Sequence, residues 1–217
     1  MKSKWLVIFL STLAFGTTAQ EVKKTGKPLK SPFGLFTGIN QIDLSVSKNP
    51  VQAIRGNAGF FAGAFFEPFR TKRTGIRSEI LFSRQGFDYE KNRRTGMVRL
   101  DYLIVPQLAS IRLTPFLDLH GGGQMAILLR GKVDSMANPS SMPAMQTKLE
   151  DYFNRVNYGM AAGLALRPLR GLSIGGRYNL FLNLLKPDSR GGYPDYVPDY
   201  SDKLRSGVWQ LYLGYQF

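Results

Sequence analysis

The chain has no cysteine in its 217 residues and a single histidine. The lack of cysteine excludes disulfides, thiol catalysis, thiolate metal ligands and a lipid anchor on an N-terminal cysteine. No G-x-S-x-G or comparable serine context is present either, so the sequence shows no recognisable serine nucleophile. We therefore expect neither a bound metal nor a cofactor.

Long apolar runs are missing after the first twenty residues. Lys2 and Lys4 precede the uncharged run 5–15, and the small residues Thr17 and Ala19 occupy the positions of a cleavage site. A run of this length is too short to span a membrane as a helix, so residues 1–19 are predicted to be a secretory signal peptide. The alternative is a buried N-terminal helix. No later stretch is long and apolar enough to predict a transmembrane helix.

Acidic residues are scarce, at 15 against 29 lysines and arginines, which gives a net charge of +14. Removal of the signal peptide takes away two lysines and leaves +12. A basic chain usually suggests a nucleic-acid partner, but export argues against one. We expect outer-membrane lipid and lipopolysaccharide as anionic partners. The mean hydropathy of −0.16 is compatible with a β-barrel, whose strands are apolar on one face only.

The last eleven residues alternate, with Trp209, Leu211, Leu213, Tyr215 and Phe217 on one face of an extended strand. A terminal aromatic residue that closes such an alternation is typical of the last strand of an outer-membrane barrel. We predict eight strands, the smallest usual number for a bacterial barrel. Their expected ranges are 34–46, 56–68, 75–88, 96–112, 115–130, 157–168, 171–185 and 206–217.

The connections between these strands support the same fold. Those after strands two, four and six are short, and those after strands five and seven, 131–156 and 186–205, are long. Outer-membrane barrels place short turns in the periplasm and longer loops outside. The sequence therefore predicts an all-β, eight-stranded antiparallel transmembrane barrel over 34–217, an up-and-down meander after a periplasmic lead-in at 20–33, with both barrel termini periplasmic. A soluble β-sandwich is the alternative.

Five segments follow one another along the chain: D-Y-L-I-V-P-Q-L-A at 101–109, P-F-L-D-L-H-G-G-G-Q at 115–124, G-M-A-A-G-L-A-L at 159–166, R-Y-N-L at 177–180, and the terminal L-G-Y-Q-F. In this order they resemble the PorT-like outer-membrane β-barrel family of Bacteroidetes. The resemblance covers roughly 34–217 and implies a cell-envelope barrel. The namesake of the family is associated with type IX secretion and gliding, which implies an accessory role in such a complex as one possible function.

Polar side chains on the predicted inward faces form a candidate lumen network. An eight-stranded barrel is just wide enough for side chains to fill it, and buried charges must pair. We therefore expect a salt-bridged plug that fixes strand register and blocks any pore, whereas the alternative is a path for protons or small ions. The expected members are Glu67, Arg77, Glu79, Arg99, Asp101, Asp118, His120, Arg177 and Asn179.

Asp118 and His120 share one strand face, two residues apart. An Asp–His pair can orient a general base in a hydrolase or acyltransferase. Ser173 is a possible inward partner, but nothing marks it as a nucleophile. We expect no catalytic residues, and the alternative is a lipid-modifying or hydrolytic enzyme that uses Asp118 and His120.

Two further sets of residues map to the ends of the predicted loops. The basic set is expected either to contact lipopolysaccharide phosphates or to form a solvated rim. In loop 186–205, Tyr193, Tyr196 and Tyr200 could contact a sugar or protein ligand, or simply pack over the barrel mouth. The basic set comprises Lys91, Arg93, Arg94, Arg130, Lys132 and Arg155.

Tyr215 and Phe217 are the expected signal for the barrel assembly machinery, which would read the terminal strand. The protein is expected to be a monomer without enzymatic activity and without a nucleic-acid partner. Its predicted role is structural, or one of binding an envelope partner through extracellular loops. The sequence names no ligand or partner.

Overall fold

The computed structural model describes residues 31–44, 53–91, 94–136, 154–182 and 206–217. Every regular element in these residues is a β-strand, so none of the described segments is a helix long and apolar enough to cross a membrane. The strands are β1 (Phe33–Leu44), β2 (Ala53–Arg70), β3 (Thr74–Lys91), β4 (Arg94–Thr114), β5 (Leu117–Met136), β6 (Val156–Leu166), β7 (Leu172–Phe181) and β8 (Ser206–Gln216).

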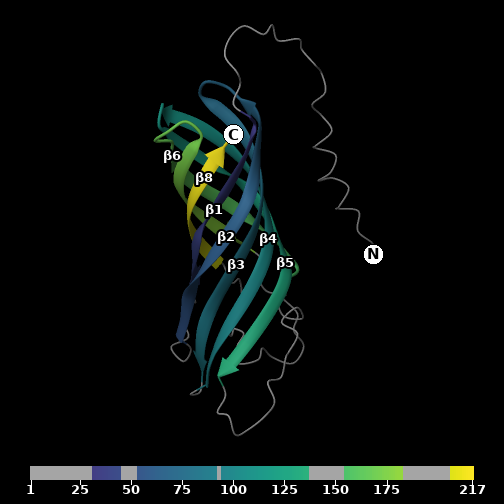
Figure 1. The fold of residues 1–217 in the computed structure, drawn as a ribbon. Coiled ribbons are helices and arrows are strands. Elements are labelled where there is room, and N and C mark those ends of the chain that lie inside the picture. Colours follow the sequence, from purple (N-terminus) through teal and green to yellow (C-terminus); the bar gives the residue numbers. More distant parts are fainter. Residues whose placement is uncertain (1–30, 45–52, 92–93, 137–153, 183–205) are drawn as a thin grey trace, which may run out of the picture.

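The eight strands pair in sequence order and close into an antiparallel barrel (Figure 1). Closure joins β1 to β8 in a continuous register from Gly34↔Gln216 to Leu44↔Ser206. The backbone amide of Phe217 also donates to the carbonyl of Phe33 at 3.2 Å. The predicted fold class, an eight-stranded meander, is therefore confirmed.

The two ends of the barrel differ. One end, called the turn end here, carries the connections 71–73, 115–116 and 167–171 and the C-terminus. The other end, the loop end, carries the remaining four connections, most of whose residues lie outside the described part. The predicted loop 131–156 was too long, because β5 continues to Met136.

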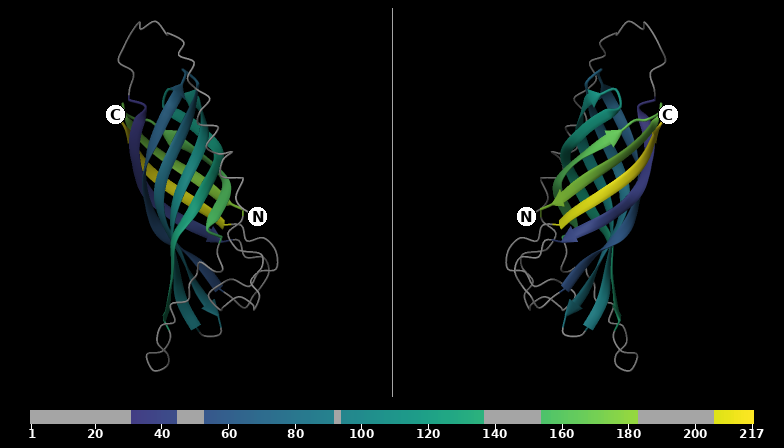
Figure 2. Two further views of the ribbon diagram at one scale, coloured as in Figure 1. Left: turned by 90° about the vertical axis from the view of Figure 1, so that its right-hand side faces the viewer. Right: turned by 90° about the vertical axis from the view of Figure 1, so that its left-hand side faces the viewer.

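Strands β2–β5 are much longer than β1 and β6–β8 and project beyond them at the loop end (Figures 1 and 2). Pairing of β2 with β3 reaches Ala53↔Glu90, whereas pairing of β1 with β2 stops at Gln41↔Ala58. The barrel proper thus ends partway along four strands, and a four-stranded sheet continues past it.

Side chains alternate between the interior and an apolar outer wall, as strand geometry requires. On β8, Trp209, Leu211, Leu213 and Tyr215 are exposed while their neighbours are buried. Aromatic side chains gather toward both ends of this wall, as in membrane barrels. At the turn end they are Phe33, Phe66, Phe69, Phe116, Tyr215 and Phe217, and toward the loop end Phe60, Phe82, Tyr158, Tyr178 and Trp209.

Glycines make room for aromatic rings at two places. Inside, the ring of Tyr212 lies where a side chain on Gly175 would stand, so Gly175 permits the close approach of β7 and β8. Outside, the ring of Tyr178 covers Gly207 in the same way. In both places the glycine on one strand leaves the space that a tyrosine ring of the neighbouring strand fills, so small and large residues lie side by side.

The interior contains both apolar and charged zones, whereas the sequence suggested a mainly polar lumen. An apolar cluster includes Phe36, Phe61 and Tyr102 and extends along β2–β5 to the loop end. The F-F pairs of β2 explain the difference, because Phe61 and Phe65 point inward while Phe60 and Phe66 face outward. The charged zone lies closer to the turn end and forms the candidate site.

Candidate functional site: charges inside and outside the barrel

Glu79 of β3 is the central acid of the charged interior. Its carboxylate accepts hydrogen bonds from Arg77 Nε at 2.7 Å and from Arg177 Nη1 at 2.6 Å. Arg177 is only 1% exposed and also donates from Nε to Gln210 Oε1 at 3.1 Å. Arg77 lies with its guanidinium carbon 3.7 Å from the centre of the Phe65 ring. The pair Glu79–Arg177 thus ties β3 to β7 across the lumen.

Glu67 and Asp118 form a second layer at the turn end. Arg70 Nη1 lies 2.6 Å from Glu67, and its Nη2 lies 3.6 Å from Asp118. Asp118 is also held by Arg112 Nε at 3.2 Å and by Arg167 Nη2 at 2.6 Å. Each carboxylate therefore serves more than one guanidinium, which satisfies the requirement that buried charges be paired.

Cations outnumber anions in this interior network. Burial lowers the pKa of the Arg167 guanidinium, as does the nearby Arg70, while Asp118 and Glu67 act in the opposite direction. Arg77 Nη2, Arg167 Nε and Arg177 Nη2 are buried without a hydrogen-bond partner among the described residues. The network therefore contains donors that no described residue satisfies.

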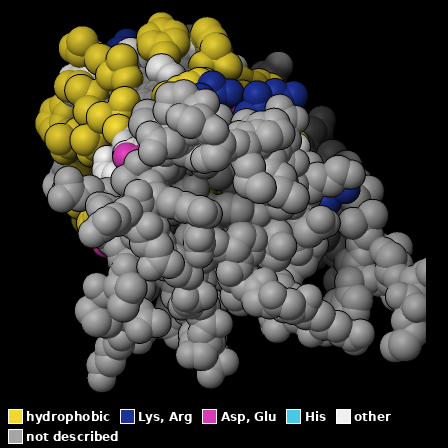
Figure 3. All heavy atoms as spheres, turned by 90° about the horizontal axis from the view of Figure 1, so that it is seen from below, with side chains coloured by type: hydrophobic (Ala, Val, Ile, Leu, Met, Phe, Trp, Pro, Cys, Tyr) yellow, Lys and Arg dark blue, Asp and Glu magenta, His cyan; other side chains and the backbone are white. Residues whose placement is uncertain are grey.

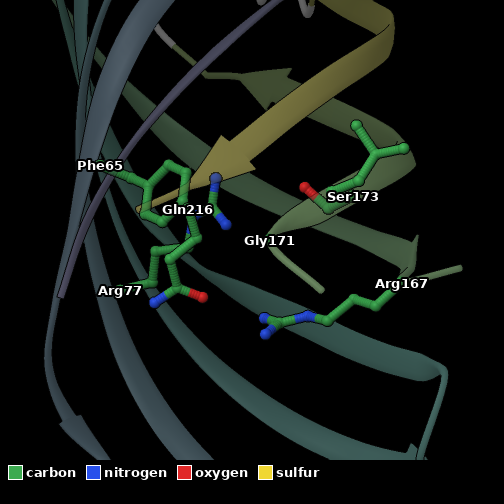
Figure 4. Close-up of a pocket in the computed structure, with 7 residues that line it drawn as sticks. Phe65, Arg77, Arg167, Gly171, Ser173 and Gln216 are labelled. Carbon is green, nitrogen blue, oxygen red and sulfur yellow. The ribbon is translucent and has the colours of Figure 1, made fainter. Parts of the chain in front are cut away.

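Two hollows adjoin the network. A cavity of about 10 Å³, the space of one water molecule, lies between Arg77, Arg167 and Gln216 and is bordered by Gly171 (Figure 4). Gly171 has a φ of 87°, a conformation that favours glycine, and its carbonyl accepts the amide of Gln216 at 2.8 Å. A wider hollow of about 890 Å³, called the vestibule here, opens at the turn end and shares Arg167 and Gln216 with the cavity.

His120 is buried beside the aromatic ring of Tyr212, at 6.3 Å between ring centres. The Asp118 carboxylate is held by arginines, and no hydrogen bond joins it to His120 within the described residues. Ser173 donates to the carbonyl of Gly214 at 3.3 Å, a backbone contact. This arrangement lacks the base–orienter hydrogen bond that a catalytic Asp–His pair needs.

Seven of the nine predicted lumen residues are buried in the interior, but Arg99 and Asp101 are not. The prediction for these two was wrong, because their neighbours Val98, Leu100 and Tyr102 occupy the inward face of β4. Residues 102–105 are apolar or aromatic, so the sequence there does not distinguish the two faces. The buried seven are Glu67, Arg77, Glu79, Asp118, His120, Arg177 and Asn179.

Asp101 instead belongs to a charged group on the outer wall. Arg84 binds it with two hydrogen bonds, Nε to Oδ1 at 2.8 Å and Nη2 to Oδ2 at 3.2 Å. Across the strands Asp101 pairs with Arg130, and Arg99 pairs with Lys132. We call Arg84, Arg99, Arg130 and Lys132, around Asp101, the outer basic cluster.

The outer basic cluster lies just beyond aromatic side chains of the wall. The guanidinium carbon of Arg84 is 5.5 Å from the centre of the Phe60 ring and 5.9 Å from that of Phe82. Arg155 is exposed. It lies close to the cluster, because its backbone carbonyl accepts a hydrogen bond from the amide of Leu128, two residues before Arg130. From the loop end, arginine and lysine side chains lie beside a wall of hydrophobic side chains (Figure 3).

Several predicted site residues fall outside the described side chains. Lys91 and Arg94 pair at the ends of β3 and β4, but their side chains are not described, and Arg93 lies outside the described residues altogether. The same holds for Tyr193, Tyr196 and Tyr200 in the connection before β8.

Tyr215 and Phe217 are exposed, with ring centres 5.6 Å apart. Their recognition by the assembly machinery stays a prediction.

Sequence reasoning missed three arginines of the interior, namely Arg70, Arg112 and Arg167. Each lies at a strand end or in a turn, where a charged residue is expected to be solvated. Their long side chains instead reach Glu67 or Asp118. The sequence signal that could have identified these arginines is their spacing, because one of them lies near each of the three short connections.

The chain is similar to several solved structures. Neisserial surface protein A superimposes with a TM-score of 0.54 at 11% identity, covering 86% of this chain and 98% of that one. The attachment invasion locus protein Ail of Yersinia pestis gives a TM-score of 0.47 at 16% identity, covering 87% of this chain and 100% of Ail. Outer membrane protein W of E. coli gives 0.40 at 11% identity, with 87% and 98% covered.

A search of the curated proteins found no match. A family model described as an outer membrane protein beta-barrel domain matches residues 18–185, which is more than half of the chain. The matched range includes seven of the eight strands, β1–β7. The chain belongs to this family of outer-membrane β-barrel proteins.

Proposed function

We propose that this protein is a non-enzymatic outer-membrane barrel that binds lipopolysaccharide through its outer basic cluster. In this proposal the turn end and both barrel termini face the periplasm, and the loop end faces the cell exterior. The single observation that carries it is the placement of Arg84, Arg99, Arg130 and Lys132 on the outer face of the wall, where the Arg84 guanidinium lies beside the rings of Phe60 and Phe82.

Charge and position both favour lipid phosphates as the partner. The cluster has four cations and one acid, so Asp101 leaves a formal excess of three positive charges. Arginine binds phosphate in a bidentate manner, and aromatic side chains mark the interface between hydrocarbon and headgroups. Cations placed just beyond such aromatic residues lie at the depth of headgroup phosphates.

The plugged interior supports a binding or structural role over transport. The Glu79–Arg177 pair crosses the lumen, and the apolar cluster with Phe61 and Tyr102 fills it further toward the loop end. A continuous water-filled path through the barrel would have to disrupt both this ion pair and the apolar cluster. The filled interior is thus suited to keeping the barrel wall rigid, and the partner would bind to the outer surface.

Lipid A binding to the purified barrel in uncharged detergent tests the proposal. We expect the double variant Arg130→Gln/Lys132→Gln to bind lipid A about tenfold more weakly, which corresponds to the loss of about 1.4 kcal/mol. The matched control is Lys72→Gln/Arg73→Gln, which removes the same two charges at the turn end. Equal affinity of the two variants would contradict the proposal.

The narrower PorT-like identity, and a role in a secretion or gliding complex, also belong to this proposal. They rest in part on the sequence segments at 101–109, in the middle of β4, and 115–124, which comprises the turn before β5 and the first part of that strand. Co-purification of the tagged protein with secretion subunits from its native envelope tests that role. Recovery of the barrel alone would count against it.

A further inference from the structure

The vestibule at the turn end is surrounded by arginines. Arg70, Arg112, Arg167 and Arg170 all line it, together with Glu67 and Gln216. Its volume of about 890 Å³ is in the range of sites for small molecules. Prolines and exposed apolar side chains also line it, including Phe69, Phe116 and Leu169. The lining of the hollow therefore combines cationic and apolar side chains.

The carboxylates already present do not balance these cations. Around the vestibule and its adjoining cavity, Glu67, Glu79 and Asp118 stand against six guanidinium groups, a formal excess of three positive charges. Arg170 makes no ion pair with any described residue. The six groups are Arg70, Arg77, Arg112, Arg167, Arg170 and Arg177.

An independent observation points to a ligand. Arg77 is at least nine-tenths buried, lines the small cavity, and its Nη2 atom has no partner among the described residues. Arg167 lines both hollows and its Nε atom is likewise unsatisfied. Buried unsatisfied donors are costly, so a water in the small cavity that bridges them to an anion in the vestibule would stabilise them.

We propose that the vestibule is a binding site for a phosphate-type oxyanion, held by Arg70, Arg112, Arg167 and Arg170 of its lining. Guanidinium groups present paired N–H donors that match the oxygens of phosphate. A dianion offsets two of the three excess charges, and the remaining volume accommodates the organic part of a phosphate ester. This site is distinct from the outer basic cluster, which lies toward the opposite end of the barrel.

Isothermal titration of the refolded barrel with inorganic phosphate, in uncharged detergent at low salt, tests the site. We expect saturable binding that weakens about tenfold or more in Arg112→Gln/Arg170→Gln, because hydrogen bonds from charged donors to phosphate are stronger than those between neutral groups. Neither substitution breaks the Glu79–Arg177 pair. Heat-modifiable migration on a gel confirms that the variant is folded.

The control is Lys72→Gln/Arg73→Gln, which lowers the charge of the same end without touching the vestibule. We expect its phosphate affinity to stay within about twofold of the parent protein, since exposed charges are screened by water and salt. A loss equal to that of Arg112→Gln/Arg170→Gln would show a diffuse charge effect and overturn the site. Absence of saturable binding by the parent protein would overturn it as well.

The phosphate could be free or could belong to a lipid headgroup. Nanodiscs of phosphatidylglycerol and of phosphatidylcholine distinguish these sources. A lipid occupant predicts a larger loss of phosphate affinity in phosphatidylglycerol for the parent protein than for Arg112→Gln/Arg170→Gln. A free anion predicts the same loss for both proteins, because the anionic lipid surface repels phosphate from each alike. Either result supports the same oxyanion chemistry.

Discussion

Arg177 of β7 and Glu79 of β3 meet across the barrel at 2.6 Å, although they lie 98 positions apart in the chain. Both side chains are almost completely buried, and Arg77, two residues before Glu79 on the same inward face of β3, binds the other oxygen of this carboxylate. Two strands on opposite walls are thereby fixed relative to each other. This ion pair fixes the position of β3 relative to β7 more strictly than apolar packing alone would.

We expect Glu79→Gln to destabilise the barrel by about 3 kcal/mol or more, because Arg177 would lose its only carboxylate partner among the described residues. The free energy of unfolding in lipid vesicles, measured by denaturant titration, gives the value. A double-mutant cycle with Arg177→Met should show that the double variant loses less than the sum of the two singles. Simple additivity would indicate that the two groups do not interact. Arg84→Gln, on the outer wall, should change stability far less.

The contact between Gly175 and Tyr212 predicts strong sensitivity to a single methyl group. Gly175→Ala places Cβ against the Tyr212 ring, and we expect a loss of about 1–3 kcal/mol in the free energy of unfolding. The matched control is Gly123→Ala, where nothing lies within 4 Å of the added carbon. If the two variants are equally stable, the ring does not rest on Gly175.

The filled interior predicts that the protein does not conduct ions. In planar bilayers we expect no stable single-channel steps, because the Glu79–Arg177 pair and the apolar side chains of the interior occupy the lumen. A known porin, reconstituted at equal protein content, serves as the positive control. Reproducible steps that vanish on heat denaturation would show that the barrel contains an open path.

Trp209 is a natural probe of membrane insertion. The sequence has two tryptophans, and the other, Trp5, lies in the predicted signal peptide. Trp209 is 57% exposed on the outer wall, 4.7 Å from the ring centre of Tyr178. We expect its fluorescence to shift to the blue on folding and to be quenched most by lipids brominated near the headgroup. Unhindered quenching by aqueous acrylamide in the folded protein would contradict this placement.

The sequence predicts which residues lie on the outer wall of this barrel better than it predicts the contacts of the side chains inside. Small residues alternate with large apolar ones in β6, so the face assignment there is unambiguous. In β4 the uninterrupted run at 102–105 suits either face, and Arg99 and Asp101 were assigned to the wrong side. Charge alone does not resolve such a case, since the loop-end part of the wall also carries charges.

The interior partners are harder to predict because they depend on side-chain reach and on closure of the barrel. Arg112 is separated from Asp118 by a tight turn, yet Arg167, from another connection, binds the same carboxylate more closely. Strand periodicity gives the face of a residue but not the direction of a flexible side chain beyond the strand end. The three turn-end arginines could be placed only once all eight strands were in register.

The unequal strand lengths expose backbone that a complete barrel would conceal. Regular strand pairing among the described residues stops at Ala58 on the β1 side of β2 and at Ile127 on the β6 side of β5. Such free sheet borders invite strand addition and self-association, and charged side chains are a common safeguard. Arg130 and Lys132 stand on the β5 border. Neutralising them should therefore reveal, besides weaker lipid binding, a tendency of copies to join into extended sheets.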